Sequence, residues 1–407
     1  MLEGILILED GVYFKGRFFG HVGETYGEVI FNTGLVGYEE ILTDPSYKGQ
    51  IVVMTYPHIG NYGVTYYDFE SIKPQIEGFV VKEFSKIFSN WQAKSSIDKL
   101  FKKYKIVGLE GVDSRALTKH IREKGSMRGL ITPEKNLNEA YKKVQQVPSI
   151  VGRDLVKKVT CSKPYSPFSE QNLPEAITYP LKENLFVDLK NIQPKYKVVV
   201  IDCGCKFNIL RFLRCYGCEL IVVPADTSAE KILGYSPDGI FLSNGPGDPE
   251  GVPYVFKTVE KVISSQLQAS NSKLQTSFIP IFGICLGHQM IALALGGKTY
   301  KLKFGHHGIN HPVKNLKNST IEITSQNHNF AVEMEEIEGK LYIKGNKDLE
   351  VTHINLNDYS CEGLIHKNLP IFAVQYHPES APGPNDSKYL FKQFVDMMEK
   401  RRMLINV

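Results

Sequence analysis

The chain has 407 residues, of which 42% are hydrophobic and 23% charged, and its formal net charge is +4. A single hydrophobic core rarely grows beyond about 250–300 residues, so this length predicts two domains of an ordinary globular protein. Because the net charge is small and Lys and Arg are spread along the chain, we expect neither nucleic acid nor a membrane surface as a partner.

The beginning of the chain and its cysteines indicate the compartment. The segment "MLEGILILEDGVYF" lacks the basic region of a signal peptide and the Arg- and Ser-rich composition of a transit peptide. No apolar run reaches the roughly 20 residues that a membrane helix needs. Seven cysteines, an odd number in a long chain, are typical of free thiols. We therefore expect a cytoplasmic protein, with a processed organellar precursor as the alternative.

The first 150 residues predict a smaller, β-rich α+β domain. The runs "LEGILILEDG", "EVIFNTG" and "QIVVMTYP" are typical of short strands ended by turn residues. One clear helix is expected in "DSRALTKHIREKG", with Asp113 as its N-cap and Gly125 at its end. A short helical piece is expected after residue 133, and the proline-containing stretch 151–194 is expected to be a connector.

From residue 195 to about 400 the pattern changes to alternating strands and helices. Strands are expected in "KVVVID", "CELIVVP", "GIFL" and "IPIFGI", with helices between and after them. This alternation predicts an α/β domain with a mostly parallel sheet flanked by helices. Sites in such sheets lie at the carboxyl ends of the strands.

The stretch "FGICLGHQ" has the form of a nucleophile elbow. Cys285 lies between Gly283 and Gly287, where a predicted strand meets a predicted helix. The glycines permit a tight turn, and the helix N-terminus favours a thiolate and offers N–H groups to an oxyanion. The alternative is a buried cysteine that packs as a small apolar side chain.

Two further motifs supply partners for a nucleophile. In "FAVQYHPES", His377 and Glu379 follow a predicted strand, and their spacing places both on one side of an extended chain. His377 is a candidate base and Glu379 its orienting acceptor, although a solvated surface turn is the alternative. The turn "SNGPGDP" could aim N–H groups at an oxyanion, or be a plain loop, and the polar "SQNHNF" is a weaker signal.

Four other cysteines suggest a metal hypothesis. Cys203, Cys205, Cys215 and Cys218 have C-x-C and C-x2-C spacing, which could indicate zinc. The first pair lies at a strand end and the second around a helix end, so we expect packing thiols and no metal site.

Taken together, "SNGPGDP", "GICLGHQ" and "QYHPE" resemble the class I glutamine amidotransferases. The segments "NTGLVGYEEILTDPSYKGQIVVMTYPHIGNYG", "VDSRALTKHIREKGSMRGLI" and "FGHHGINHPV" narrow the resemblance to the small chains of carbamoyl-phosphate synthetase. It extends from about residue 4 to 395.

The resemblance implies a function. Cys285 would be the nucleophile, His377 the base and Glu379 its partner in hydrolysing L-glutamine through a γ-glutamyl thioester. The ammonia would pass to a large chain that makes carbamoyl phosphate from bicarbonate with ATP and Mg²⁺; no cofactor is expected in this chain. The implied glutamine-contact residues are Ser46, Gly245, Gly247, Leu286, Gln289, Asn327, Asn329 and Phe330.

The chain departs from this family at a few positions. Asn329 and Ile309 stand where the family usually has glycine. We expect Asn329 to function because Asn tolerates positive φ and because the contact that the family makes at this position is largely through backbone. Residues 264–277 are expected to be a surface insertion. The alternative functions are a stand-alone γ-glutamyl hydrolase and a non-catalytic docking module. The sequence does not identify the pathway served, effectors, the assembly order or a possible fusion to the large chain.

Overall fold

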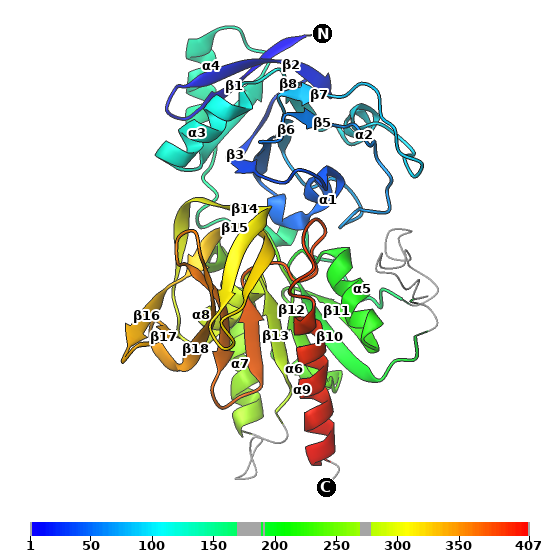
Figure 1. Cartoon of the computed structure of the whole chain (residues 1–407), viewed down its shortest axis with the longest axis vertical. Helices are drawn as coiled ribbons and strands as arrows, with labels where there is room; N and C mark the ends of the chain where they lie inside the picture. Colours follow the sequence, from blue (N-terminus) through cyan, green and yellow to red (C-terminus); the bar gives the residue numbers. More distant parts are fainter. Residues whose placement is uncertain (1, 169–188, 190–191, 269–277, 406–407) are drawn as a thin grey trace.

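The structure is a computed structural model that describes residues 2–168, 189, 192–268 and 278–405. Two domains are stacked along the long axis of the molecule, with the N-terminal half at the top and the C-terminal half below (Figure 1). Among the described residues, no helix has the length and apolar character required to span a bilayer.

The N-terminal domain is built on a closed β-barrel with the strand order β1-β2-β8-β6-β4-β3-β9. The strand pairs β3–β4, β4–β6 and β6–β8 are parallel, and the other pairs of the barrel are antiparallel. The barrel strands are β1 (Glu3–Leu8), β2 (Tyr13–Gly20), β3 (Thr25–Asn32), β4 (Gln50–Met54), β6 (Gly78–Val80), β8 (Val107–Glu110) and β9 (Met127–Thr132). The sequence predicted the β-rich character of this domain but not the closure.

Helices cover the barrel. The expected helix is α3 (Ser114–Lys124), in which the Asp113 side chain accepts a hydrogen bond from the Ala116 N–H and Gly125 is the C-cap. The structure also forms α1 (Tyr38–Thr43), α2 (Ile97–Tyr104) and α4 (Leu137–Gln145). Because α4 packs on β1 and β9 in one apolar cluster, it belongs to the barrel domain. The strands β5 (His58–Ile59) and β7 (Glu83–Phe84) form a separate, two-stranded parallel sheet in this domain.

Five neighbouring strands of the C-terminal sheet are parallel, in the order β11-β10-β12-β13-β20. They are β10 (Tyr196–Asp202), β11 (Cys218–Pro224), β12 (Gly239–Leu242), β13 (Ile281–Ile284) and β20 (Ile371–Val374).

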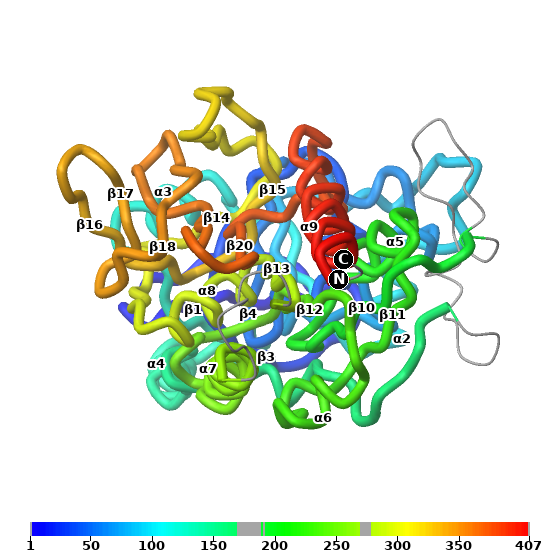
Figure 2. Tube along the Cα trace, turned by 90° about the horizontal axis from the view of Figure 1, so that it is seen from below, coloured from blue at the N-terminus to red at the C-terminus, as the bar shows by residue number. Residues whose placement is uncertain are grey.

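Alternate residues of these strands point to opposite faces, and both faces are covered by helices. Val198 and Val200 share a core with α5 (Phe207–Cys215) and α9 (Tyr389–Ile405). Val199 and Ile201 share another core with α6, α7 and α8. Figure 2 shows the two helical layers on either side of the sheet. The helices of the second core are α6 (Ala229–Gly234), α7 (Pro253–Gln268) and α8 (Leu286–Ala294).

The rest of this sheet is antiparallel, so the expectation of a mostly parallel sheet needs correction. After β20 the sheet continues through β19, β18, β14 and β15, and β16 and β17 form a hairpin at its side. Consecutive strands of the segment 299–366 are joined by short turns, which suit antiparallel pairing, whereas parallel pairing needs a long crossover. These strands are β14 (Thr299–Asn315), β15 (Ile321–Val332), β16 (Met334–Ile337), β17 (Lys340–Ile343), β18 (Asn346–Asn355) and β19 (Cys361–His366).

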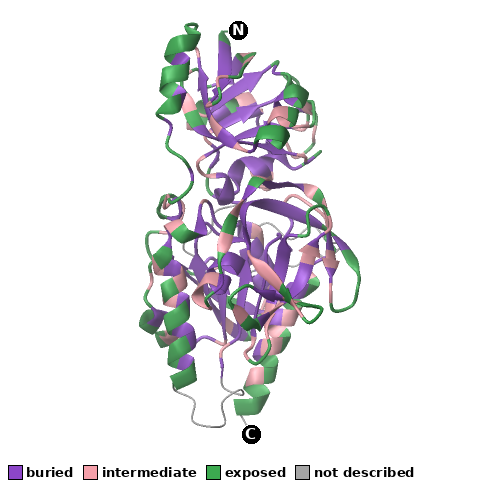
Figure 3. Cartoon of the chain, turned by 90° about the vertical axis from the view of Figure 1, so that its left-hand side faces the viewer, coloured by how far each residue is buried: buried purple, intermediate pink, exposed green. Residues whose placement is uncertain are grey.

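The two domains share a core. One apolar cluster joins Tyr38, Tyr47 and Phe79 of the barrel domain to Phe282 and Tyr376 of the sheet domain. The buried zone is continuous across the junction in Figure 3. The carboxyl ends of the parallel strands therefore face the barrel, and a site there can take side chains from both domains.

Two expectations fall partly outside the described residues. In the proposed connector, residues 169–188 and 190–191 are not described, and its described part includes a 3-10 turn, η2 (Val156–Lys158). In the proposed insertion, residues 264–268 continue α7 and residues 269–277 are not described. The domain boundaries stay predictions.

Candidate active site

Cys285 lies at a sharp turn between β13 and α8, as expected. Its backbone has φ 55° and ψ −106°, and it is the N-cap of α8. The Cys285 N–H donates to the Val374 carbonyl at 2.9 Å, and its own carbonyl accepts from the Gln289 N–H at 3.2 Å. Positive φ at a cysteine is a strained conformation that the surroundings must enforce, and nucleophile elbows have a strained turn of this kind. The side chain is buried, with 2% exposure.

The two glycines of this motif have a different role from the expected one. Neither Gly283 nor Gly287 has positive φ. A Cβ on Gly283 would lie 2.7 Å from the Gly287 backbone, and one on Gly287 would lie 2.3 Å from the Leu242 carbonyl oxygen. The cysteine itself makes the bend, and the glycines allow α8 to approach β12 and β13 closely.

His377 and Glu379 form the expected pair. The His377 Nδ1 and Glu379 Oε1 atoms are 2.7 Å apart, and both side chains are buried. They are brought together by a turn after β20, with the Ser380 N–H donating to the His377 carbonyl at 3.0 Å, rather than by an extended chain. His377 Nε2 has no hydrogen-bond partner among the described residues. The Cys285 thiol donates to the Asn327 carbonyl at 3.5 Å.

A buried lysine completes this charge arrangement, and the sequence analysis missed it. Lys206 Nζ is 2.9 Å from Glu379 Oε1 and donates to the Ser380 carbonyl at 2.5 Å. Lys206 is 1% exposed and directly precedes α5. A lysine within the largely apolar run "CGCKFNIL", at the end of a parallel strand, was the available signal.

Burial and charge pairing oppose each other at these groups. Burial alone would raise the pKa of Glu379, but Lys206 and His377 outweigh it and lower that pKa to about 2. Burial alone would lower the pKa of His377, but Glu379 and Cys285 raise it to about 10. Burial likewise lowers the pKa of Lys206, yet the carboxylates of Glu379, Asp44 and Glu70 raise it overall. Glu379 is therefore an anion held between two cationic groups.

Most residues expected to contact glutamine line one small cavity with Cys285. They come from the barrel domain, the glycine-rich turn, α8 and β15. The lining consists of Ser46, Gln50, Gly245, Gly247, Cys285, Gln289, Asn327, His328, Asn329 and Phe330. Leu286 is not part of the lining, but its side chain packs against Gly245. Gln50 and His328 were not among the sequence candidates.

The barrel wall of the cavity is held to the sheet domain by Asp44, another residue that sequence reasoning missed. Asp44 Oδ1 accepts from the Ser46 N–H at 2.9 Å, and its Oδ2 accepts from Asn327 Nδ2 at 2.8 Å. Asn244 Nδ2 donates to Ser46 Oγ at 2.9 Å. Ser46 follows Asp44 in the short 3-10 turn η1 (Pro45–Tyr47).

The Asn329 side chain has a partner of its own. Asn329 lies within β15, and its φ is not positive, so the expected tolerance of positive φ is not needed. Its Oδ1 is 3.1 Å from His307 Nε2, while His307 Nδ1 is 3.0 Å from Asn327 Oδ1. One histidine thus connects the two asparagines of the cavity. Ile309, the other departure, lies in β14.

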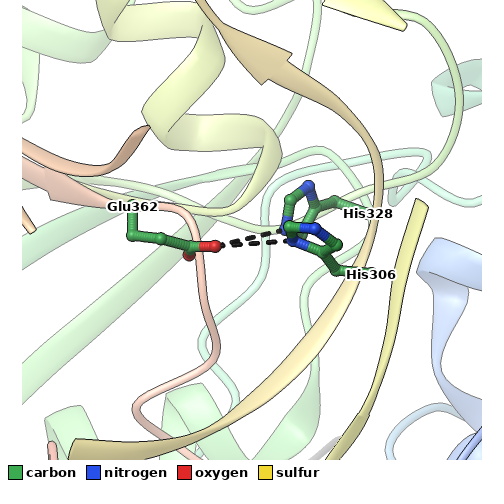
Figure 4. Close-up of side chains that lie close together, drawn as sticks. All are labelled: His306, His328 and Glu362. Atoms are coloured by element: carbon green, nitrogen blue, oxygen red, sulfur yellow. Dashed lines mark ion pairs between the residues drawn. The ribbon is translucent and has the colours of Figure 1, made fainter. Parts of the chain in front are cut away.

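One group of described residues, His306, His328 and Glu362, has the composition of a metal site (Figure 4). Glu362 Oε1 is 3.5 Å from His306 Nδ1 and 4.0 Å from His328 Nε2. Hydrogen bonds already satisfy the carboxylate, because Asn355 Nδ2 donates to the same Oε1 at 2.8 Å and Gln326 Nε2 to Oε2 at 3.0 Å.

A protonated histidine supplies the positive charge of this cluster. Burial alone would lower the pKa of His306, but the carboxylates of Asp358 and Glu362 raise it to about 9. We therefore describe the cluster as an imidazolium between two carboxylates, and the expectation of no metal site stays a prediction.

The four cysteines considered for zinc cannot meet at one ion. Cys218 is opposite Tyr196 at the start of β10, whereas Cys203 follows Asp202 at its end. Seven strand residues separate these ends by about 20 Å. Cys203, Cys205, Cys215 and Cys218 are free thiols, and all but the half-buried Cys215 are buried.

A cysteine on an elbow, a histidine–carboxylate pair and a glycine-rich turn lie together at the strand ends, as expected for an amidotransferase domain of class I. Residues 199–397 match the model of the class I glutamine amidotransferases, and residues 6–131 match that of the carbamoyl-phosphate synthase small chain, CPSase domain.

Curated relatives match along nearly the whole chain. A carbamoyl phosphate synthase small chain from Chlorobaculum tepidum is 49% identical over 98% of this chain and 98% of its own. One from Aquifex aeolicus is 51% identical over 97% of this chain and 98% of its own. One from Porphyra purpurea is 46% identical over 100% of this chain and 99% of its own. The chain belongs to the family of carbamoyl-phosphate synthase small chains.

Proposed function

We propose that this chain hydrolyses L-glutamine with Cys285 as nucleophile, His377 as general base and acid, and Glu379 as the group that orients His377. The observation that carries the proposal is the convergence of the Cys285 elbow and the 2.7 Å His377–Glu379 pair at the ends of neighbouring strands β13 and β20. A thiolate next to an imidazolium is the reactive state of such a pair.

The proposed reaction proceeds through a covalent intermediate. The Cys285 Sγ attacks the γ-amide carbon, and the oxygen becomes an oxyanion. The N–H groups of Leu286 and Gly245 hold it, since the N–H of a first helical residue has no partner within its helix. His377 donates a proton to the leaving nitrogen, ammonia departs, and a γ-glutamyl thioester remains. Water, deprotonated by His377, then releases glutamate and restores the thiol.

The ammonia is proposed to pass to the large chain of carbamoyl-phosphate synthetase, which uses it with bicarbonate, ATP and Mg²⁺. Membership in the small-chain family supports this partner, and no cofactor is proposed for the present chain. A cavity of about 380 Å³ adjoins the triad, with Glu379 in its lining together with Asn208, Arg211 and Lys388. It shares no lining residue with the small cavity at Cys285, so passage between the two requires displacement of the side chains around Glu379.

The test is a Cys285→Ser variant assayed in complex with the large chain. We expect loss of glutamine-dependent carbamoyl phosphate synthesis and unchanged ammonia-dependent synthesis. Cys215→Ser, at a half-buried thiol near the end of α5, is the matched control and should retain both activities. Equal loss of both activities in the Cys285 variant would contradict the proposal. Retained glutamine use would exclude Cys285 as the nucleophile.

A further inference from the structure

Gln50 places an unpartnered polar atom in the candidate glutamine cavity. It is the first residue of β4 and is 1% exposed. Its backbone is fixed by the barrel, because it pairs with Glu28 of β3 and its carbonyl accepts from the Glu77 N–H at 2.9 Å. Its side chain lines the cavity that contains Cys285.

The Gln50 Oε1 atom is buried and has no hydrogen-bond partner among the described residues. Among the described side chains that line the cavity, no other has such a buried, unpartnered polar atom. Gln289 Nε2, for example, donates to the Phe330 carbonyl at 2.8 Å, and Asn327 Nδ2 donates to Asp44. Buried acceptors are nearly always paired in native proteins, so an unpaired one in a cavity indicates a ligand donor.

The charged end of an amino acid needs hydrogen-bond acceptors in this cavity. None of the described residues that line it is Asp or Glu. An α-ammonium group removed from water must donate its hydrogen bonds to side-chain or backbone oxygens. The γ-amide has to lie at Cys285 in the sheet domain, whereas Ser46 and Gln50 line the same cavity from the barrel domain and are available to the amino-acid end.

We propose that Gln50 is a substrate-binding residue whose Oε1 accepts a hydrogen bond from the α-ammonium group of glutamine. This inference rests on the glutaminase function proposed above and adds a substrate contact from the barrel domain. The site then distinguishes glutamine from carboxylic acid amides that have no α-amino group.

The experiment compares glutamine with glutaramate, which is glutamine without the α-amino group. In the complex with the large chain, Gln50→Met removes the acceptor at similar volume. We expect the KM for glutamine to rise about 10- to 100-fold, the effect of losing a hydrogen bond to a charged group. The inhibition constant of glutaramate should change less than about 2-fold, and ammonia-dependent synthesis should be unchanged. Gln50→Glu, which keeps an acceptor oxygen, should retain the preference for glutamine.

The control is Gln75→Met, at a buried barrel-domain glutamine that donates to Ser71 Oγ at 3.0 Å and should leave both constants unchanged. Equal weakening of glutamine and glutaramate by Gln50→Met would overturn the inference, as would no change in either, the result expected if only a resident water binds Oε1. Loss of the preference in Gln50→Glu would also overturn it. A wild-type complex without glutamine-dependent activity would instead refute the proposed function.

Discussion

Asn327 Nδ2 donates a 2.8 Å hydrogen bond to Asp44 Oδ2 and so joins strand β15 of the sheet domain to the barrel domain. The same carboxylate accepts from the Ser46 N–H with its other oxygen. One aspartate therefore fixes the Ser46 backbone on one wall of the candidate glutamine cavity and the Asn327 side chain on the other. Neither wall can move independently while both hydrogen bonds remain.

Replacing Asp44 by Asn should weaken glutamine binding. An amide has only one acceptor oxygen, so its NH2 group must face one of the two donors that the carboxylate accepts from. We expect the KM for glutamine to rise about 10-fold in the complex with the large chain, with unchanged ammonia-dependent synthesis. Asp113→Asn is the control, because Asn is an equally good N-cap for α3. An unchanged KM in Asp44→Asn would show that the aspartate does not organise the cavity.

Replacing Lys206 by Met should destabilise the fold as well as the site. Removal of one partner from a buried ion pair typically costs about 3–5 kcal/mol of unfolding free energy, because the other charge stays buried. Without the lysine the pKa of Glu379 should rise, which weakens its hold on His377 and lowers kcat. The exposed Lys392–Asp396 pair on α9 provides the comparison, and Lys392→Met should cost less than about 1 kcal/mol. Denaturant unfolding of both variants measures the difference, and equal costs would contradict the role of burial.

Gly245→Ala should impair glutamine hydrolysis through backbone displacement. A Cβ at this position would lie 2.3 Å from the Cys203 carbonyl oxygen, so the glycine-rich turn must shift away from Cys285. We expect glutamine-dependent kcat to fall by about 100-fold, the effect of losing an oxyanion donor. Gly234→Ala is the matched control, since a Cβ there meets no atom within 4 Å and the residue ends helix α6. That change should be neutral or slightly stabilising. Normal turnover in Gly245→Ala would argue against an oxyanion contact at this turn.

The His306 ion pairs should make stability depend on pH in the alkaline range. The pKa of His306 is raised from 6.5 to about 9 in the folded chain. Its stabilisation is therefore complete below about pH 6.5 and is lost as the pH rises through 9. Compared with His306→Gln, the wild type should gain about 1–3 kcal/mol at pH 6 and much less at pH 10, with the gain limited because Asp358 is partly exposed. Urea unfolding at the two pH values tests this, and a difference that grows with pH would have the wrong sign.

The site residues that could be predicted from sequence are those that lie within a short, recognisable sequence motif. Cys285, His377 and Glu379 each stand next to a strand end with turn residues, and the structure brings His377 and Glu379 within hydrogen-bond distance. Asp44 and Lys206 carry no such motif, because their partners are distant in the chain: Asp44 pairs with a residue 283 positions away. The apolar run around Lys206 indicates burial, but only tertiary packing reveals which residue pairs with each of these two charges.

The fold shows the same limit. Apolar runs predicted strands β10 to β13, and the capping residues Asp113 and Gly125 predicted helix α3. Both signals depend only on neighbours in sequence. Closure of the barrel could not be predicted, because it depends on β1 pairing with both β2 and β9, and β9 is far away in sequence. The antiparallel half of the large sheet was missed because its strands are irregular: the β14–β15 pairing has two register shifts, and β18 has others.

Alternate residues of β15 belong to two different groups of side chains, the asparagines of the candidate glutamine cavity and the cluster around Glu362. Along β15, Asn327 and Asn329 both contact His307, whereas the His328 side chain between them bonds to Gln326 and the Phe330 carbonyl, beside Glu362. Successive side chains of a strand point to opposite faces, so an insertion or deletion of one residue before Asn327 would exchange the two sets. Gene variants that change the length of this hairpin should therefore be tolerated only at its turn, residues 316–320, and not within β15.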